Sequence, residues 1–341
     1  MTKVGIIGGS GYSGKELIRI LLDHPHVEIK FIFAKSSADK KLSDIYPIFK
    51  NRLDITIETF SENRLKNIDL VFSALPHGES MEILPEIVDS GKKVIDLGGD
   101  FRFKNTDVYE QWYGKKHIAQ REAQSFVYGL AELNSEKIKN SNCIANAGCY
   151  PTSAILGLVP ILQTDWIDTN NIVVNSMSGV SGAGRKASVE LNYCEVNESV
   201  KAYRIGNHQH TPEITTVIEE YLGKKINIIF VPHLIPINRG IYTTIYLKPF
   251  EKIDSVKLRE LYTEYYKDSL FVRISDEAPQ IQNVVYTNFC DIYVTYSEKS
   301  GFIVINSVLD NLIKGAAGGA VQNMNLMYGY NEGEGLNGPR N

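Results

Sequence analysis

A glycine-rich loop near the start of the sequence most constrains the fold. A β-rich run over residues 3–7 leads into Gly8-Gly9-Ser10-Gly11-Tyr12-Ser13-Gly14, and an apolar-faced helical stretch over 15–22 follows. The loop satisfies both G-x-G-x-x-G and G-x-x-G-x-x-G, and its glycines let the backbone approach a pyrophosphate at the helix N-terminus. Ser13 and Glu16 form a capping-box pattern that predicts the helix start. This order predicts a dinucleotide-binding βαβ unit, and a glycine-rich turn without a ligand is the alternative.

The end of the second expected strand favours NADP over NAD. That strand covers residues 28–34, and Lys35, Ser36 and Ser37 follow it, with no acidic residue before Asp39. A fold that prefers NAD usually places Asp or Glu here, on the ribose 2′-hydroxyl. Lys35 and Ser36 can instead hold a 2′-phosphate through charge and hydrogen bonding.

The order of strands and helices predicts two domains of different architecture. The 341 residues are enough to build two cores. Up to residue 148, short buried strands alternate with helices, which predicts a parallel, doubly wound α/β sheet. The later strands are longer and more β-branched, which predicts an α+β domain with a mainly antiparallel sheet. Strands are expected there over residues 171–176, 226–231, 242–247, 291–296 and 302–309, and a closely packed helix over 311–327.

Cys149 lies in a turn between an expected strand over 141–145 and an apolar helical run over 152–162. Pro151 suits the first helical turn, where no backbone N–H is required. Unpaired amides and the positive end of the helix dipole favour a thiolate at this position. Cys149 is therefore a candidate nucleophile, and an inert buried thiol is the alternative.

The segment over residues 206–213 supplies candidate acid–base groups. His208 and His210 are expected on the same side of an extended segment, and Glu213 is a carboxylate that can orient an imidazole. Surface loop residues are the alternative, and a metal site is disfavoured because no third ligand lies at a suitable spacing. The arginines that could bind a negatively charged substrate are Arg102, Arg185, Arg204 and Arg239.

Charge and cysteine content narrow the class of protein. The net charge is −4 and the pI is near 6.0, so no nucleic-acid or anionic-membrane partner is expected. The four cysteines contain no C-x-x-C pair, no apolar stretch reaches membrane-spanning length, and the N-terminus lacks a signal-peptide layout. We therefore expect a cytoplasmic protein.

Taken together, these motifs resemble those of the N-acetyl-γ-glutamyl-phosphate reductase family, within the group of aspartate-semialdehyde and glyceraldehyde-phosphate dehydrogenases. The resemblance runs nearly end to end, and the cysteine and histidine motifs at this separation are highly specific. Besides the glycine loop, it rests on residues 74–78, 100–102, 128–130, 148–152, 178–185, 208–213, 232–234, 238–240 and 310–318.

The resemblance implies an NADP-dependent reductase of arginine biosynthesis. Cys149 would attack the γ-acyl phosphate of N-acetyl-γ-glutamyl phosphate and release inorganic phosphate, and NADPH would reduce the thioester to N-acetylglutamate semialdehyde. His208 or His210 would handle the proton, with Glu213 orienting it. The cofactor would contact Gly8, Ser10, Gly11, Tyr12, Ser13, Gly14, Lys35, Ser36, Pro76, Ser178, Gly179 and Asn311, while Arg102 and Arg185 would bind the substrate.

The resemblance also implies how the domains are arranged along the chain. The final helix would return to a discontinuous, NADP-binding Rossmann domain of residues 1–148 and 311–341. Residues 149–310 would form the catalytic and oligomerisation domain, and the protein would be a homo-oligomer, either a dimer or a tetramer. The glycine- and asparagine-rich end after Tyr330 is expected to fray.

Three departures from the family pattern concern the shape of the substrate site. Ala147 stands where Pro is frequent, residues 96–100 read Asp-Leu-Gly-Gly-Asp in place of Asp-Leu-Ser-Ala-Asp, and residues 282–288 carry Gln and Tyr where Lys and Gly are common. The alternative function is therefore the same chemistry on N-succinyl-glutamyl, aminoadipyl or aspartyl phosphate. Two further classes of protein fit some of the motifs, namely a cysteine hydrolase or acyltransferase and a nicotinamide-binding sensor without chemistry.

Overall fold

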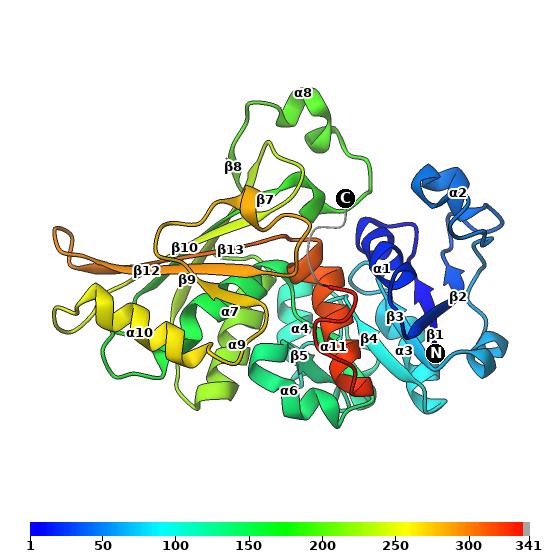
Figure 1. The fold of residues 1–341 in the computed structure, drawn as a ribbon, viewed down its shortest axis with the longest axis horizontal. Coiled ribbons are helices and arrows are strands. Elements are labelled where there is room, and N and C mark those ends of the chain that lie inside the picture. Colours follow the sequence, from blue (N-terminus) through cyan, green and yellow to red (C-terminus); the bar gives the residue numbers. More distant parts are fainter. Residues whose placement is uncertain (337–341) are drawn as a thin grey trace. The chain divides into compact units, whose positions relative to one another are not determined.

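The computed structural model describes residues 1–336, which form two compact units (Figure 1). Of the described residues, unit 1 comprises Met1–Ala147 and residues 316–336, and unit 2 comprises Gly148–Gly315. The chain therefore passes between the units just before Cys149 and just after Gly315. The expected fraying after Tyr330 is wrong for residues 331–336, because the Glu332 and Glu334 carbonyls accept from Asn325 Nδ2 and Leu336 is buried. The expectations for residues 337–341 lie outside the described residues.

Unit 1 contains a six-stranded sheet in which every pair of neighbours is parallel, in the order β2-β1-β3-β4-β6-β5. The strands are β1 (Thr2–Ile7), β2 (Val27–Phe33), β3 (Leu70–Ser73), β4 (Lys93–Asp96), β5 (Val127–Gly129) and β6 (Cys143–Asn146). The helices are α1 (Tyr12–Leu22), α2 (Leu42–Ile45), η1 (Pro47–Phe49), η2 (Glu62–Asn67), α3 (Ser80–Asp89), α4 (Thr106–Tyr113), α5 (Gln120–Ala123), α6 (Ala131–Lys139) and α11 (Gly318–Tyr328).

Both faces of this sheet are covered, which explains its unbroken apolar strands. Strand β2 lies on one side of β1 and β3 on the other, so the connections β1–β2 and β3–β4 run in opposite directions. Right-handed crossovers then place α1 and α3 on opposite faces. On the α3 face, Leu84 and Ile87 pack with Val71 and Val94 of the strands and with Phe33. The order reverses at β1, and ligands of such sheets bind at that reversal, outside the carboxyl ends of the strands.

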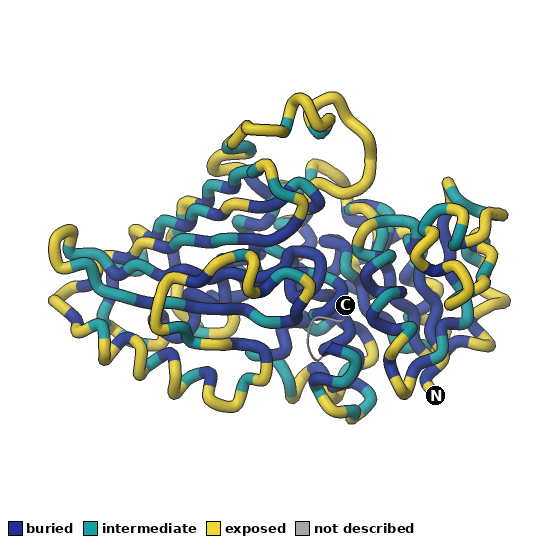
Figure 2. The backbone as a smooth tube through the Cα atoms, turned by 45° about the horizontal axis from the view of Figure 1, so that its top comes forward, coloured by how far each residue is buried: buried dark blue, intermediate teal, exposed yellow. Residues whose placement is uncertain are grey.

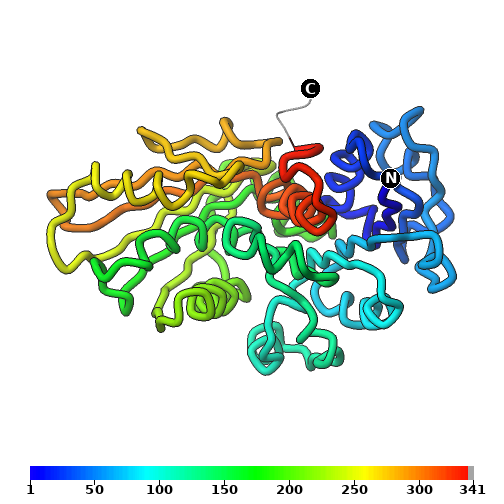
Figure 3. The backbone as a smooth tube through the Cα atoms, turned by 60° about the horizontal axis from the view of Figure 1, so that its bottom comes forward, coloured from blue at the N-terminus to red at the C-terminus, as the bar shows by residue number. Residues whose placement is uncertain are grey.

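Helix α11, from the end of the described chain, packs in unit 1 against α1 and α6, and Figure 3 shows it beside α1. Asn325 Oδ1 on this helix lies at a hydrogen-bond distance of 3.0 Å from Nε2 of the buried His24. The Thr2 and Tyr330 hydroxyls, 328 residues apart, lie 2.6 Å from each other. The single helix expected over 311–327 is wrong in one respect, because a π-helical turn, η6 (Ile313–Ala317), precedes α11.

Unit 2 contains a seven-stranded mixed sheet in the order β11-β12-β13-β10-β7-β9-β8. The strands are β7 (Ile172–Gly179), β8 (Lys201–Ala202), β9 (Ile228–Ile235), β10 (Ile241–Leu247), β11 (Val272–Ile274), β12 (Cys290–Ser297) and β13 (Phe302–Leu309). The pairs β7–β9 and β11–β12 are parallel and the remaining pairs are antiparallel, so the predicted mainly antiparallel sheet is confirmed.

Unit 2 also contains helices and helical turns, and its longest helices pack against the sheet. The helices and turns are α7 (Cys149–Leu162), η3 (Val180–Ala183), η4 (Val189–Leu191), α8 (Tyr193–Val196), α9 (His210–Leu222), α10 (Ser255–Tyr265) and η5 (Ile281–Asn283). Helices α7, α9 and α10 contact strands of the sheet, and α7 contacts both α9 and α10. The Ser153 hydroxyl of α7 lies 2.9 Å from that of Thr243 and donates to the Ser307 carbonyl, which fixes the helix on β10 and β13. Residues 150–162 of α7 are all buried, and Figure 2 shows the segment around α8 as an exposed arch.

Candidate active site

The glycine loop follows β1 and can be built only from glycine at two positions. Gly8 has φ +83°, and a Cβ on it would lie 2.8 Å from the Ala74 carbonyl carbon. A Cβ on Gly14 would lie 2.7 Å from the Gly9 Cα. The loop is therefore pressed against the segment that follows β3, at the edge where parallel sheets bind ligands.

Helix α1 begins earlier than its capping-box pattern suggests. The Ser13–Glu16 prediction is wrong, since Gly11 is the N-cap and provides no side-chain cap, while Glu16 Oε2 accepts from Arg19 Nε at 2.8 Å. Because Gly11 has no side chain, it offers no acceptor to the amides of the first turn of α1. Those amides can instead donate to the oxygens of a bound phosphate.

Tyr46 supports the loop from outside and is not identified by the sequence motifs. Its hydroxyl donates to the Ser10 carbonyl at 2.8 Å, and Lys15 Nζ lies 5.3 Å from the centre of its ring. Tyr46 lies in the connection between α2 and η1, 36 residues after Ser10. No local sequence pattern therefore indicates this contact.

The remaining predicted cofactor residues of unit 1 lie after neighbouring strands. Lys35 and Ser36 follow β2, and Pro76 follows β3, both strands being hydrogen-bonded to β1. The Lys35 side chain is 69% exposed and its Nζ lies 3.9 Å from a Glu82 carboxylate oxygen. The carboxyl ends of these parallel strands meet at one sheet edge with the glycine loop.

Two buried carboxyl groups lie at the carboxyl end of β4, Asp96 as its last residue and Asp100 four residues later. Asp100 accepts from the amides of Gly78 (2.7 Å) and Met81 (3.2 Å) and from the Tyr109 hydroxyl (2.9 Å). Asp96 accepts from the Ser80 hydroxyl at 2.8 Å, and its Oδ2 has no hydrogen-bond partner among the described residues. Burial and the charge of Asp100 raise the pKa of Asp96 to about 7.

The two predicted substrate arginines lie in different units. Arg102 is buried in unit 1, where Nε donates to the Asn146 carbonyl and Nη2 to the Leu97 carbonyl, each at 2.9 Å. It thereby joins the chain after β4 to the end of β6. Arg185 lies in the exposed segment after η3 in unit 2.

Cys149 is the first residue of α7 and is partly exposed. Gly148 is the N-cap, and its carbonyl accepts from both the amide and the hydroxyl of Thr152 at 2.8 Å. Pro151 occupies the first turn as expected. The turn therefore places the thiol at the positive end of a helix that is otherwise almost entirely buried.

A buried carboxylate holds this turn from the opposite side. Glu213, in the first turn of α9, is fully buried and its Oε1 accepts from the Gly148 amide at 2.8 Å. The sequence assigns Glu213 to orienting a histidine, and the structure adds a direct contact with the residue that precedes the nucleophile. A bond between residues 65 apart links the start of α7 to the start of α9.

The two histidines are close together, although not in an extended segment. Gln209 has helical angles and His210 begins α9, so that expectation is wrong. The turn brings the imidazole rings of His208 and His210 to 4.8 Å, and the His210 amide lies 3.1 Å from His208 Nδ1. Both rings lie within 6 Å of the Tyr150 ring, at 5.7 and 5.8 Å, next to Cys149 in the chain.

Two tyrosine hydroxyls complete the cluster, and sequence motifs do not identify Tyr203. The hydroxyls of Tyr150 and Tyr203 lie 3.1 Å apart, and the Tyr203 ring lies 5.5 Å from that of His208. Burial raises the pKa of Tyr203 to about 12 and that of Tyr150 higher, and a charged Cys149 adds to both increases. Both hydroxyls are therefore protonated donors near neutral pH.

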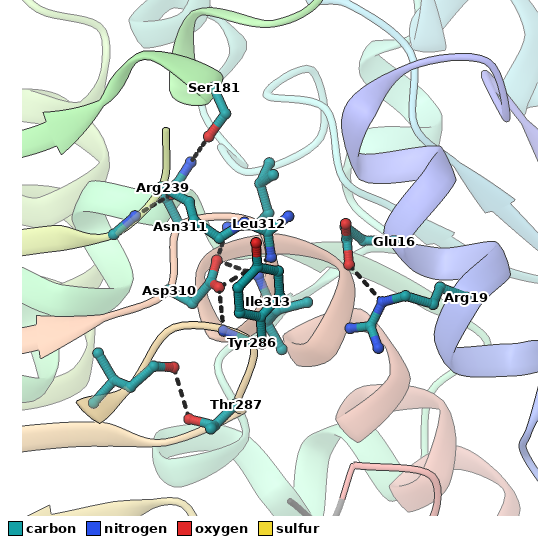
Figure 4. A network of polar contacts seen from close by, with 12 residues as sticks. Glu16, Arg19, Ser181, Arg239, Tyr286, Thr287, Asp310, Asn311, Leu312 and Ile313 are labelled. Atoms are coloured by element: carbon teal, nitrogen blue, oxygen red, sulfur yellow. Dashed lines mark hydrogen bonds and ion pairs between the residues drawn. The ribbon is translucent and has the colours of Figure 1, made fainter. Parts of the chain in front are cut away.

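The predicted cofactor residues of unit 2 lie at the end of β7, which holds Ser178 and Gly179, and in the segment after β13, which holds Asn311. Asn311 Oδ1 accepts from the Gly240 amide at 2.7 Å and its Nδ2 donates to the Ser181 hydroxyl at 3.0 Å. Figure 4 shows the Asn311–Ser181 contact. The Ser178 hydroxyl donates to the Gly179 carbonyl at 3.0 Å.

Comparison with known proteins now decides the family. A family model described as semialdehyde dehydrogenase, NAD binding domain, matches residues 3–141, and one described as semialdehyde dehydrogenase, dimerisation domain, matches 149–311. N-acetyl-gamma-glutamyl-phosphate reductases from Caldicellulosiruptor bescii and Desulforudis audaxviator are 46% and 44% identical to the chain, each covering 98% of both sequences. The chain belongs to the N-acetyl-gamma-glutamyl-phosphate reductase family.

Solved structures agree on the fold of this reductase family member. Aspartate semialdehyde dehydrogenase II from Vibrio cholerae, complexed with ASA, superposes with a TM-score of 0.73 at 17% identity, covering 96% of this chain and 98% of that one. Aspartate semialdehyde dehydrogenase from Candida albicans, solved with NADP, gives a TM-score of 0.71 at 16% identity and the same coverage. The predicted fold class, a Rossmann domain with an α+β domain, is confirmed.

Proposed function

We propose that this reductase family member converts N-acetyl-γ-glutamyl phosphate to N-acetylglutamate semialdehyde with NADPH, through a thioester on Cys149. The observation that carries the proposal is the Cys149 turn. Its thiol begins a buried helix, a buried carboxylate holds the preceding amide, and a histidine pair packs on the following residue. The shared name of the relatives supplies the substrate.

Cys149 is the proposed nucleophile, because its place at the N-terminus of α7 favours the thiolate. The sulfur forms a bond to the γ-carbonyl carbon of the acyl phosphate. The bond from that carbon to the phosphate oxygen breaks, and inorganic phosphate leaves with the electron pair. Arg102 and Arg185 are proposed to bind the charged groups of the substrate.

The glycine loop fits a dinucleotide, because a Cβ at Gly8 or Gly14 would overlap the backbone and the N-cap of α1 is a glycine. A pyrophosphate would rest on the amides at the start of α1. NADPH bound there supplies the hydride that reduces the thioester carbonyl. The residues proposed to hold the cofactor are Gly8, Ser10, Gly11, Tyr12, Ser13, Gly14, Lys35, Ser36, Pro76, Ser178, Gly179 and Asn311.

His208 or His210 moves the proton in this proposal. Reduction leaves a negative oxygen on the hemithioacetal, which an imidazolium of the pair protonates. The same imidazole then takes that hydroxyl proton while the carbon–sulfur bond breaks and the Cys149 thiolate leaves. Glu213 fixes the geometry, since it holds the amide next to the nucleophile.

We assign NADP binding to unit 1 and catalysis to unit 2. The proposed domains are 1–148 with 311–341, and 149–310. In support, the compact units divide at Ala147/Gly148 and at Gly315/Ala316, and the NAD-binding and dimerisation models match 3–141 and 149–311.

We propose that the protein is a homo-oligomer, a dimer or tetramer, and that copies contact one another through the sheet of unit 2. Ile245 faces α7, so neighbouring positions on the strands point to the opposite face of the sheet. On that face Met177, Ile229 and Tyr246 are 44%, 48% and 36% exposed. Analytical ultracentrifugation tests this, because Ile229→Lys should shift the protein toward monomer. A monomeric unsubstituted protein would contradict the proposal.

The proposed compartment is the cytoplasm. All four cysteines are free thiols, which suits a reducing compartment. Among residues 1–336, the structure has no helix of the length and apolar character needed to cross a membrane.

The direct test runs the reaction in reverse with N-acetylglutamate semialdehyde, phosphate and NADP, followed by the absorbance of NADPH. Phosphate-dependent turnover is expected, and Cys149→Ala should lower it by at least about a thousandfold while leaving NADPH affinity unchanged. A panel of N-succinyl-glutamate, aminoadipate and aspartate semialdehydes tests the acyl group. An active Cys149→Ala variant would overturn the mechanism.

A further inference from the structure

Gly315 lies directly against the nucleophile. A Cβ on Gly315 would stand 2.8 Å from the Cys149 Cβ and 3.0 Å from its Cα, closer than real Cβ atoms pack against such neighbours. Gly315 belongs to the π-helical turn η6, and such turns are rare and frequent at functional sites. The position of this turn therefore sets the space beside the thiol.

Asp310 orders the turn through both its side chain and its main chain. Its carboxyl is fully buried, and Oδ1 accepts from the amides of Leu312 (2.8 Å) and Ile313 (3.2 Å). Its carbonyl oxygen accepts from the Gly315 amide at 3.0 Å. One residue thus fixes the entry of η6 and the glycine that touches Cys149.

Two groups from other segments hold Asp310 in place (Figure 4). Oδ2 accepts from Arg239 Nη1 at 3.1 Å and from the Tyr286 amide at 2.6 Å. Arg239 is 9% exposed, so the ion pair is almost fully removed from water. Loss of one member of such a pair leaves a buried charge without its partner, which moves the groups around it.

Tyr286 adopts an unfavourable backbone to make this contact. Its φ is +64°, a left-handed conformation that L side chains with a Cβ avoid and that glycine adopts freely. Glycine is common at this position according to the family resemblance. Here the tyrosine amide points to Asp310 while the ring covers the Arg239 guanidinium at 4.2 Å, and these two contacts compensate for the strain.

We propose that Asp310 is a positioning residue for Cys149, held by Arg239 and Tyr286 and acting through the η6 turn on the Gly315–Cys149 contact. The inference deepens the proposed function, since it concerns the same nucleophile. It differs from a purely stabilising role because it predicts an effect confined to Cys149 among the cysteines of the chain.

Asp310→Asn tests the proposal, because the amide keeps the size of the side chain and removes its charge. The matched control is Asp291→Asn, which breaks a second Arg–Asp pair of unit 2, between Arg273 and Asp291 on β11 and β12. That Arg273 also lies on an aromatic ring, Phe289, at 4.3 Å. The control therefore removes an Arg–Asp pair whose arginine is more exposed than Arg239, at 44%, without touching η6.

The readout is alkylation by iodoacetamide, measured at each cysteine by peptide mass spectrometry. Cys194 is exposed and serves as the reference, while the buried Cys143 and Cys290 report loss of the fold. In Asp310→Asn we expect Cys149 alkylation to rise about fivefold because the released turn no longer packs against it, while kcat falls about tenfold and the KM for NADPH stays within twofold. Asp291→Asn should leave Cys149 alkylation and kcat at the wild-type values.

Two outcomes would overturn the positioning role. One is Cys149 alkylation and kcat in Asp310→Asn within twofold of wild type. The second is a parallel rise at Cys143 and Cys290, which would mean general unfolding. The alkylation measurement needs no substrate, so it decides the role of Asp310 even if N-acetylglutamate semialdehyde gives no turnover, a result that would count against the proposed function alone.

Discussion

The glycine loop and the Cys149 turn both start a helix after a parallel strand, but they are built differently. In unit 1, Gly8 and Gly14 shape the loop by lacking side chains, and their neighbours are backbone atoms of Gly8, Gly9 and Ala74. In unit 2, the turn depends on side chains from distant segments, namely Glu213 and the residues that hold Gly315. The glycine loop is thus a backbone site, and a contiguous sequence motif is enough to encode it. The Cys149 turn is a side-chain site, because its contacts come from segments that only the fold brings together.

The largest expected effect tests the side-chain site. Glu213→Ala removes the acceptor of the Gly148 amide, and we expect kcat to fall about a hundredfold, since precise placement of reacting groups carries effects of this size. Glu213→Gln keeps an oxygen for that amide and should recover most of the activity. Steady-state kinetics at fixed pH measure both variants. Equal losses in the two would show that the charge of Glu213, and not its hold on the turn, matters.

The next effect tests the backbone site. Gly14→Ala places a methyl group against the Gly9 backbone, and the NADPH Kd should rise roughly thirtyfold as the loop shifts. Alkylation of Cys149 without cofactor should not change, because the thiol lies in unit 2. Gly114→Asn is the control, since it lies at an open helix end with φ +66° where asparagine is tolerated. Isothermal titration that finds unaltered NADPH affinity in Gly14→Ala would contradict the backbone origin of the site.

A smaller effect concerns cofactor choice. Lys35→Ala removes an exposed positive charge after β2, and we expect the preference for NADPH over NADH in kcat/KM to fall about tenfold, with activity on NADH unchanged. Lys30→Ala, in the middle of β2, is the comparison variant. The two ratios come from parallel assays with each cofactor. An unchanged preference would remove Lys35 from the 2′-phosphate site.

The smallest effect concerns stability and its pH dependence. The pKa of Asp96 in the folded protein, about 7, lies above the ordinary carboxyl value, so its proton favours folding and stability falls as the pH rises from about 4 toward 7. Asp96→Asn keeps an acceptor for the Ser80 hydroxyl without a titrating group. The Tm gain of this variant should therefore be larger at pH ~8 than at pH ~5, by several degrees. Asp276→Asn, at an exposed carboxylate, should show no such trend, and a gain that is the same at both pH values would contradict the assignment.

Local patterns predict much of the fold, because each expected strand is a short apolar run flanked by turn residues. The runs over 3–7, 28–34 and 93–97 correspond to β1, β2 and β4 within a residue or two. The helix start at Cys149 is equally local, since Gly148 and Pro151 flank it. Short strands such as β5, β8 and β11 are missed, because two or three residues are too few to show an alternation of apolar and polar side chains. Only their hydrogen bonds to neighbouring strands define them.

Sequence motifs predict the residue types of the candidate site but not the contacts between residues that are distant in the sequence. Cys149, His208 and Glu213 are readable as residue types, but the contact of Glu213 with Gly148 joins residues 65 apart and follows from packing of α7 with α9. The contacts of Tyr203 with Tyr150 and of Gly315 with Cys149 are equally nonlocal. Extended backbone was wrongly expected at the histidines because alternation of two residues does not distinguish a strand from a turn.

The proposed mechanism depends on Cys149 as the residue that carries the acyl group. A half-reaction checks this step by mixing the enzyme with N-acetylglutamate semialdehyde and NADP without phosphate and determining the mass of each cysteine peptide. We expect an N-acetylglutamyl thioester on the Cys149 peptide, formed with NADPH and discharged when phosphate is added. No adduct despite NADPH formation, or an adduct at Cys143, Cys194 or Cys290, would contradict the mechanism.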